Sequence, residues 1–186
     1  HKPTIPPEHD LPMGSWSAEQ IKDATQRASM LTWTPGKAKN VLPVLTHGKG
    51  VYVYDTNGKE YLDWTSQAVC ANVGHDTPQA VVDAVVKQMQ DLPFAYGGMG
   101  LTEIRARLSS LLSDHVLPGD LQGMVFPSSG GEANEAAIMM ARRYTGRHKV
   151  ITWYRSYHGG TGNVLQATGD ARRWLGRDAI PGFVKA

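Results

Sequence analysis

The chain has 186 residues, of which 41% are hydrophobic and 19% charged, so it can bury one domain core but is short for two. Its net charge of +2 is too small to indicate binding to nucleic acid or to an anionic membrane surface. The single cysteine, Cys70, cannot form an internal disulfide, and no apolar stretch of the sequence reaches membrane-spanning length.

Residues 1–14 are rich in Pro and His and predict an irregular leader. They lack the apolar core of a signal peptide, and the sequence contains no Asn-x-Ser/Thr glycosylation sequon. An intracellular, cytoplasmic location is therefore expected by default, with a mitochondrial location left open.

The next elements expected are a short helix and a β-hairpin. Ser17-Ala-Glu-Gln20 has the pattern of a capping box, which predicts a helix that begins after Ser17. Two β-rich runs between residues 51 and 64 flank an Asn-Gly pair, the strongest short signal for a hairpin turn. Asp55 and Asp63 flank that turn and are expected to be solvated.

Two further helices are predicted in the middle of the chain. Thr77 is expected to cap a helix with Pro78 at its first position, and apolar residues recur at helical spacing over residues 80–92. After a glycine-rich loop, residues 104–112 carry one apolar stripe, and Pro118-Gly119 should end that element.

A strand, a tight turn, a helix and a second strand are predicted in direct succession after residue 123. The first strand covers residues 124–127, the turn contains Ser129-Gly130-Gly131, and the second strand follows Lys149. This order places free amides of a helix N-terminus at the carboxyl edge of a sheet, which favours a bound phosphate. No Lys follows the turn as in a nucleotide P-loop, and a plain N-capped turn fits the same pattern equally well.

Tyr157 and His158 follow the second strand at the same edge. An aromatic ring there could cover a flat heterocycle, although a buried structural tyrosine fits the position too. His158 is a candidate acid–base group or a structural residue. The histidines have no ligand-like spacing, so no metal site is predicted. No GxGxxG follows a strand and no GxSxG is present, which disfavours dinucleotide binding and serine hydrolysis.

With these motifs assembled, the chain resembles the class III (ω-amino acid) aminotransferases. Four motifs of that family occur here in order. They are its early hairpin at residues 50–63, its GH-x-x-P helix entry at 72–78, its SG-[ST]-EANE stretch at 126–135 and its YHG at 157–159. The resemblance implies an α/β fold, PLP-dependent transferase fold type I, that is incomplete here. Residues 1–75 would be an N-terminal segment with the helix and hairpin, and residues 76–186 the first part of the large three-layer αβα domain.

The resemblance implies pyridoxal 5'-phosphate (PLP) as the cofactor. Ser129, Gly130 and Gly131 would bind its phosphate, Tyr157 would stack on its ring, and His158 would stand close by. The family usually has Ser, Thr or Ala where this chain has Gly131, which keeps the backbone donor and loses any hydroxyl contact.

The resemblance also implies a substrate pocket and a partner. Ala68 and Val69 fall where the family lines its pocket, and Tyr96 falls where a residue reaches the partner subunit's site. A homodimer with shared active sites, an amino donor and a 2-oxo acid acceptor is therefore implied.

The Schiff-base Lys of the family would lie beyond Ala186, and Lys185 stands in no matching context. The sequence is therefore expected to be an N-terminal fragment of an aminotransferase, inactive alone, that moves an amino group to a 2-oxo acid such as pyruvate. The alternatives are a truncated non-catalytic homologue, an aminomutase or decarboxylase of the same class, and an unrelated α/β protein that binds a nucleotide or sugar phosphate.

Overall fold

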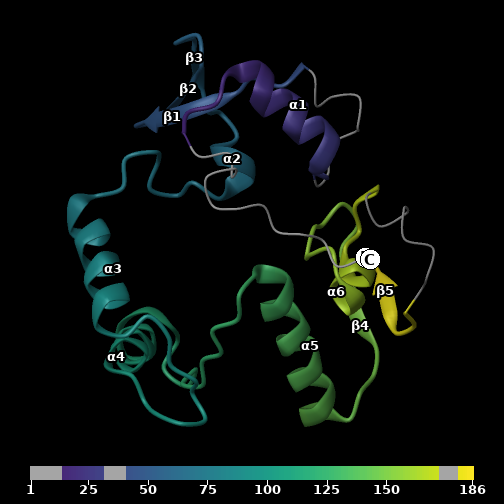
Figure 1. Cartoon of the computed structure of the whole chain (residues 1–186). Coiled ribbons are helices and arrows are strands. Elements are labelled where there is room, and N and C mark those ends of the chain that lie inside the picture. The colour runs from purple at the N-terminus through teal and green to yellow at the C-terminus, as the bar shows by residue number, and fades with distance from the viewer. Residues whose placement is uncertain (1–13, 32–40, 172–179) are drawn as a thin grey trace, which may run out of the picture. The chain divides into compact units, whose positions relative to one another are not determined.

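The computed structural model describes residues 14–31, 41–171 and 180–186 (Figure 1). The chain divides into two units, one up to Phe94 and one from Ala95 onward. The division expected after residue 75 stays a prediction. The predicted leader lies outside the described residues except for Gly14.

The predicted capping box is confirmed at the start of helix α1 (Ala18–Ala28). The Ser17 hydroxyl accepts a hydrogen bond from the amide of Gln20 at 3.2 Å, and the Gln20 side chain accepts one from the amide of Ser17 at 2.8 Å. Each side chain therefore satisfies an amide that the helix itself leaves unpaired.

The predicted hairpin is confirmed, and it belongs to a three-stranded antiparallel sheet in the order β1-β2-β3. The strands are β1 (Leu45–Lys49), β2 (Tyr52–Asp55) and β3 (Glu60–Leu62). Gly58 in the β2–β3 turn has a φ of +76°, which a side chain would strain. Strand β1 was not predicted because its sequence, LTHGK, lacks an apolar alternation.

The prediction that Asp55 is solvated is wrong. Its side chain accepts hydrogen bonds from the amides of Asn57 and Lys59, at 2.9 and 3.0 Å, and from the Tyr61 hydroxyl at 2.9 Å. The residue is buried, with 7% of its surface exposed. Asp55 thus fixes the hairpin turn from inside, because it satisfies amides that the tight turn leaves unpaired.

Helix α3 (Gln79–Asp91) begins after a short turn, α2 (Ser66–Val69). The prediction of Thr77 as its N-cap is wrong by one position: Pro78 is the N-cap, in an extended conformation, and no side chain caps the helix. The carbonyl of Pro78 accepts the hydrogen bond from the amide of Val81 at 2.9 Å. Proline suits this position because it has no amide to leave unpaired.

The second unit begins with the predicted helix α4 (Glu103–Leu111), which continues as a π-helical turn, η3 (Leu112–Val116), and ends before Pro118. Helix α5 (Gly130–Thr145) follows the predicted Ser-Gly-Gly turn. Gly146 ends it in the left-handed conformation, and its amide donates to the carbonyl of Arg142 at 2.9 Å.

The second sheet has two parallel strands, β4 (Val150–Thr152) and β5 (Phe183–Lys185). Two predictions are corrected here. The last residues, in which no strand was predicted, form β5, whereas residues 124–127 are not a strand. A strand needs a hydrogen-bonded neighbour, and within the described residues β4 pairs only with β5.

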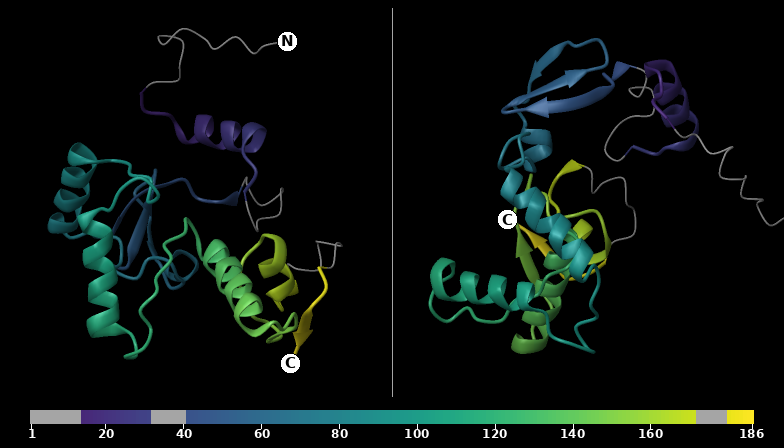
Figure 2. Two further views of the ribbon diagram at one scale, coloured as in Figure 1. Left: turned by 90° about the horizontal axis from the view of Figure 1, so that it is seen from below. Right: turned by 60° about the vertical axis from the view of Figure 1, so that its left-hand side comes forward.

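Helix α6 (Gly162–Ala167) packs against both α5 and β4. Figure 2 shows α5, α6 and β5 gathered within the second unit. Val164 and Thr168 are fully buried there. No helix in the described parts of the chain is both long and apolar enough to cross a membrane.

Candidate functional site

The N-terminus of α5 is the predicted phosphate cup. The Ser129 hydroxyl accepts a hydrogen bond from the amide of Glu132 at 3.2 Å, and the Glu132 carboxylate accepts one from the amide of Ser128 at 2.8 Å. Two donors are thus capped by the chain itself. Among the described residues no hydrogen bond is made by the amides of Gly130 and Gly131, and these two groups are the part of the cup that an anion can use.

The structure brings the cup and the Tyr157-His158-Gly159 segment together. A Cβ built on Gly159 would stand 3.0 Å from the Cα of Gly131, so the two backbones touch closely. The Asn134 side chain also donates to the carbonyl of His158 at 2.8 Å. The two segments predicted to hold the cofactor are therefore neighbours, although their role in binding it stays a prediction.

Tyr157 and His158 differ in their exposure. Tyr157 is exposed to solvent over 47% of its surface. His158 lines a cavity of about 150 Å³ between α5 and β4, where its Nε2 is buried and has no hydrogen-bond partner within the described structure. Its amide donates to the Thr168 hydroxyl at 3.0 Å, which fixes the backbone of the segment.

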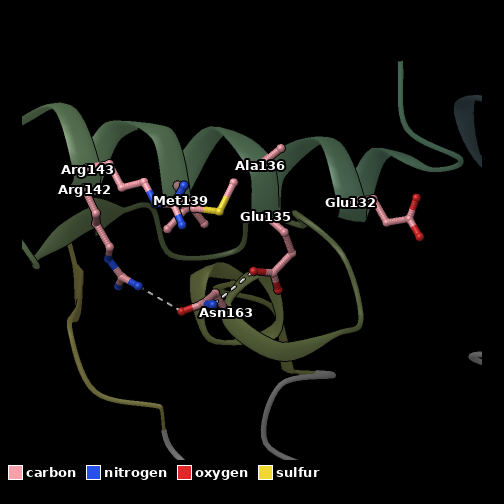
Figure 3. A pocket seen from close by; sticks show the side chains of 8 residues that line it. Glu132, Glu135, Ala136, Met139, Arg142, Arg143 and Asn163 are labelled. Carbon is pink, nitrogen blue, oxygen red and sulfur yellow. Dashed lines mark hydrogen bonds between the residues drawn. The ribbon is translucent and has the colours of Figure 1, made fainter. Parts of the chain in front are cut away.

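A polar network joins α5 to α6 behind the cup (Figure 3). The carboxylate of Glu135 accepts from the amide of Val164 at 3.1 Å and from the side chain of Asn163 at 3.0 Å. Asn163 in turn accepts a hydrogen bond from Arg142 at 3.0 Å. In the sequence, Glu135 is only the last residue of the EANE stretch. No signal in the spacing predicts that it caps the start of α6 across 29 residues.

The predicted substrate-pocket residues Ala68 and Val69 lie on the turn α2, in the first unit. All four of its residues are non-glycine residues with positive φ, between 48° and 67°. Val69 is exposed over 87% of its surface. Tyr96 belongs to the second unit, where its ring lies over Gly98, and 65% of it is exposed.

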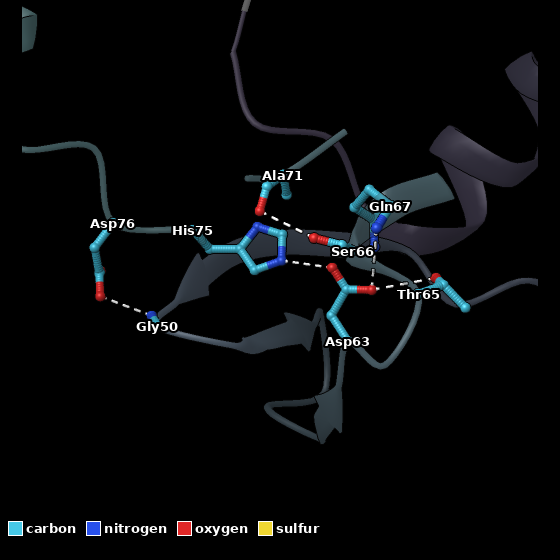
Figure 4. Close-up of polar contacts among 8 residues, drawn as sticks. All are labelled: Gly50, Asp63, Thr65, Ser66, Gln67, Ala71, His75 and Asp76. Atoms are coloured by element: carbon cyan, nitrogen blue, oxygen red, sulfur yellow. Dashed lines mark hydrogen bonds and ion pairs between the residues drawn. The ribbon is translucent and has the colours of Figure 1, made fainter. Parts of the chain in front are cut away.

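The prediction that Asp63 is solvated is also wrong. One oxygen of its carboxylate lies 2.8 Å from Nε2 of His75, and the other accepts a hydrogen bond from the amide of Gln67 at 3.2 Å (Figure 4). Its side chain is only 4% exposed. Burial raises the pKa of Asp63, but the hydrogen bonds from Gln67 and His75 outweigh burial and hold that pKa below the ordinary value.

Asp55 and Asp63 should make the fold sensitive to acid. For Asp55 too, burial raises the pKa, while the amides of Lys59 and Asn57 bring it below the ordinary 3.8. A carboxyl group with a lowered pKa stabilises the fold fully above its unfolded value, and that stability is lost as the pH falls from there through the native pKa. We expect the Asp55→Asn/Asp63→Asn variant to lose less stability than the unmodified protein between about pH 5 and pH 2. Urea unfolding at several pH values measures this, and equal losses would contradict it.

The ammonium group of Lys185 makes structural hydrogen bonds to strand β4 and to the end of helix α6. Its ammonium group donates to the Thr152 hydroxyl at 2.8 Å and to the main-chain carbonyls of Gln166 at 2.7 Å, Thr168 at 3.0 Å and Ala167. These carbonyls lie at the C-terminal end of α6. The ammonium group therefore caps the C-terminal end of α6, in agreement with its lack of a family context.

The fold matches that of known transaminases. A taurine:2-oxoglutarate aminotransferase from Bifidobacterium kashiwanohense, solved with PLP and glutamate, has a TM-score of 0.85 and 34% identity, over 94% of this chain and 39% of that one. An (S)-enantioselective ω-transaminase from Thermomicrobium roseum has a TM-score of 0.85 and 29% identity, over 92% of this chain and 40% of that one. The chain therefore has part of the α/β fold of PLP-dependent transferases of fold type I.

The model of the aminotransferase class-III family matches residues 34–185. The chain belongs to this family, whose cofactor is PLP. Acetylornithine aminotransferase of Listeria monocytogenes is 38% identical over 75% of this chain, and the matched region spans 35% of that relative's length. The chain thus spans about a third of the curated relatives that it matches.

Proposed function

We propose that this chain provides the phosphate cup and ring-binding segment of a PLP-dependent aminotransferase. The observation that carries the proposal is the contact of the α5 N-terminus with residues 157–159, in which Gly131 lies against Gly159 and the Asn134 side chain donates to the carbonyl of His158. The enzyme moves an amino group from an ω-amino acid or amine to a 2-oxo acid such as pyruvate. The names of the relatives, which include acetylornithine and taurine, support an amino donor whose reacting amine is not on the carbon that bears its acidic group, a carboxylate in one and a sulfonate in the other.

The residues of the cup suit the phosphate of PLP. Nothing lies within 4 Å of a Cβ built on Gly130, so an anion can approach the main chain there. The amides of Gly130 and Gly131 and the positive end of α5 attract a dianion. When bound, PLP supplies an electron sink for the substrate amine, and the protein's contribution is to orient and hold it. Tyr157 would cover one face of the ring, while Asn134 fixes the backbone of that segment.

We also propose that the enzyme works as a homodimer, in which Tyr96 contributes to the partner's site. Its exposure supports this assignment.

The test of the proposed function uses the protein expressed from the complete reading frame of the gene. Incubation with PLP, an ω-amine donor and pyruvate should yield alanine, and the visible absorption of bound PLP should change when the donor is added. Absence of both alanine and bound PLP would overturn the proposal.

Tyr157→Ala should weaken PLP binding by about 1 kcal/mol, which is the usual contribution of an aromatic contact. This corresponds to roughly a fivefold higher Kd, measured by fluorescence titration of the apo-protein. Tyr154→Ala is the matched control, because Tyr154 follows the same strand and is 66% exposed. Equal losses in the two variants would contradict the assignment of Tyr157 to the ring.

A further inference from the structure

The turn α2 is a left-handed helical turn built without glycine. Ser66, Gln67, Ala68 and Val69 have φ values of 51°, 48°, 61° and 67°. This conformation is unfavourable for a non-glycine residue, because Cβ approaches the following carbonyl oxygen. Such a run persists only where the surrounding contacts hold it, and strained backbone of this kind clusters at functional sites.

Main-chain hydrogen bonds close the C-terminal end of the turn. The amides of Val69 and Cys70 donate to the carbonyls of Thr65 and Ser66, each at 2.8 Å. The Ser66 hydroxyl donates to the carbonyl of Ala71 at 3.0 Å. These bonds fix the shape of the turn but do not tie it to the rest of the unit.

Asp63 makes that connection. The carboxylate oxygen that accepts a hydrogen bond from the Gln67 amide also accepts one from the Thr65 hydroxyl at 3.3 Å. This oxygen therefore holds the start of the turn in place. The other oxygen meets Nε2 of His75 at 2.8 Å. One buried carboxylate therefore links the left-handed turn to the segment that leads into α3.

His75 is itself held against the sheet. Its amide donates to the carbonyl of Gly50 at 2.8 Å, and a Cβ on Gly48 would stand 2.5 Å from the Cβ of His75. The Asp76 carboxylate accepts from the amide of Gly50 at 2.7 Å. His75 is thus fixed against strand β1 and the β1–β2 turn. Only a glycine at position 48 leaves room for its side chain.

We infer that Asp63 and His75 are positioning residues that hold the left-handed turn, so that Ala68 and Val69 present a fixed apolar wall to the amino donor. This inference rests on the proposed function. Val69 is 87% exposed and Ala68 is exposed as well, so neither side chain belongs to the core of the first unit. The pair acts on donor binding through the backbone of the turn and touches neither PLP nor the donor.

The first test compares variants of the protein from the complete reading frame, loaded with PLP. Asp63→Asn and His75→Phe should each raise the KM for the amino donor about tenfold to a hundredfold, with the Kd for PLP unchanged. The double variant should match the worse single one, because both changes break one unit. Asp55→Asn is the matched control: it removes a buried carboxylate of the same hairpin that does not reach the turn. The inference is overturned if Asp55→Asn raises the KM as much as Asp63→Asn does, or if neither variant changes the KM.

The second test is hydrogen exchange, which does not depend on activity. The amides of Val69 and Cys70 should exchange roughly tenfold faster in Asp63→Asn than in Asp55→Asn, as the loss of a hydrogen bond to a buried charge implies. Adding Gln67→Gly to Asp63→Asn relieves strain at φ 48° and should restore part of the protection. Equal exchange in both single variants overturns the inference, whereas an unmodified protein without transamination overturns only the proposed function.

Discussion

Replacing Gly130 with Asp should abolish retention of PLP. The new carboxylate would stand at the first position of α5, beside the amides that we propose bind the phosphate. Two unit charges about 4 Å apart repel by roughly 4 kcal/mol at the effective dielectric of a protein surface, and the phosphate carries nearly two charges. This penalty corresponds to a Kd raised about a thousandfold.

The same substitution should not harm the fold. A Cβ on Gly130 has nothing within 4 Å, and Gly130 does not have a positive φ. An acidic residue in the first turn also stabilises a helix through its dipole. Loss of PLP would therefore report on the anion site and not on unfolding, which circular dichroism of the variant checks.

Gly130→Asn is the matched control, because it has the same shape as Asp without the charge. PLP occupancy after dialysis should fall far less in Gly130→Asn than in Gly130→Asp. Unchanged PLP occupancy in Gly130→Asp would show that the phosphate does not bind at this helix end, which would contradict the proposed cup.

Local signals predicted the local structure well. The capping box at Ser17, the Asn57-Gly58 turn and the Ser129 cap are each decided by bonds between residues within four positions. Such bonds follow from side-chain chemistry and backbone preference alone, so the sequence contains the needed information.

Long-range contacts set the features that the sequence did not predict. Asp63 looks like an ordinary turn residue until His75, 12 positions later, returns to the same sheet. The left-handed turn has no glycine to signal it. Strand β5 has only three residues, and its pairing with β4 bridges 33 positions. No periodicity encodes these contacts, because tertiary packing decides them.

The cup itself was predicted from the Ser-Gly-Gly turn and the family resemblance, yet its surroundings were not. The sequence does not show that Glu132 caps the amide of Ser128, or that Glu135 orders α6. Each of these two carboxylates accepts a hydrogen bond from an amide of its own, that of Ser128 for Glu132 and that of Val164 for Glu135.

Replacing Lys185 with Met should destabilise the second unit by about 3 kcal/mol. Met has a similar length and no charge, so packing changes little while the hydrogen bonds to the end of α6 are lost. Hydrogen bonds to a charged group contribute about 1.5–3 kcal/mol, and carbonyls left buried without a donor add to the loss. Those carbonyls belong to Gln166, Ala167 and Thr168, none of which is more than 7% exposed.

Lys149→Met is the matched control, since Lys149 directly precedes β4 and is exposed. Urea unfolding of both variants should show a large loss for Lys185→Met and almost none for Lys149→Met, because exposed charges contribute little. Hydrogen exchange at the amide of Ala186, which donates to the carbonyl of Thr152 at 2.9 Å, should rise only in the former. If the two variants unfold alike, the ammonium group does not cap α6. The strand β5 would then be held by its ladder with β4 alone, and Lys185 would be available for a different role.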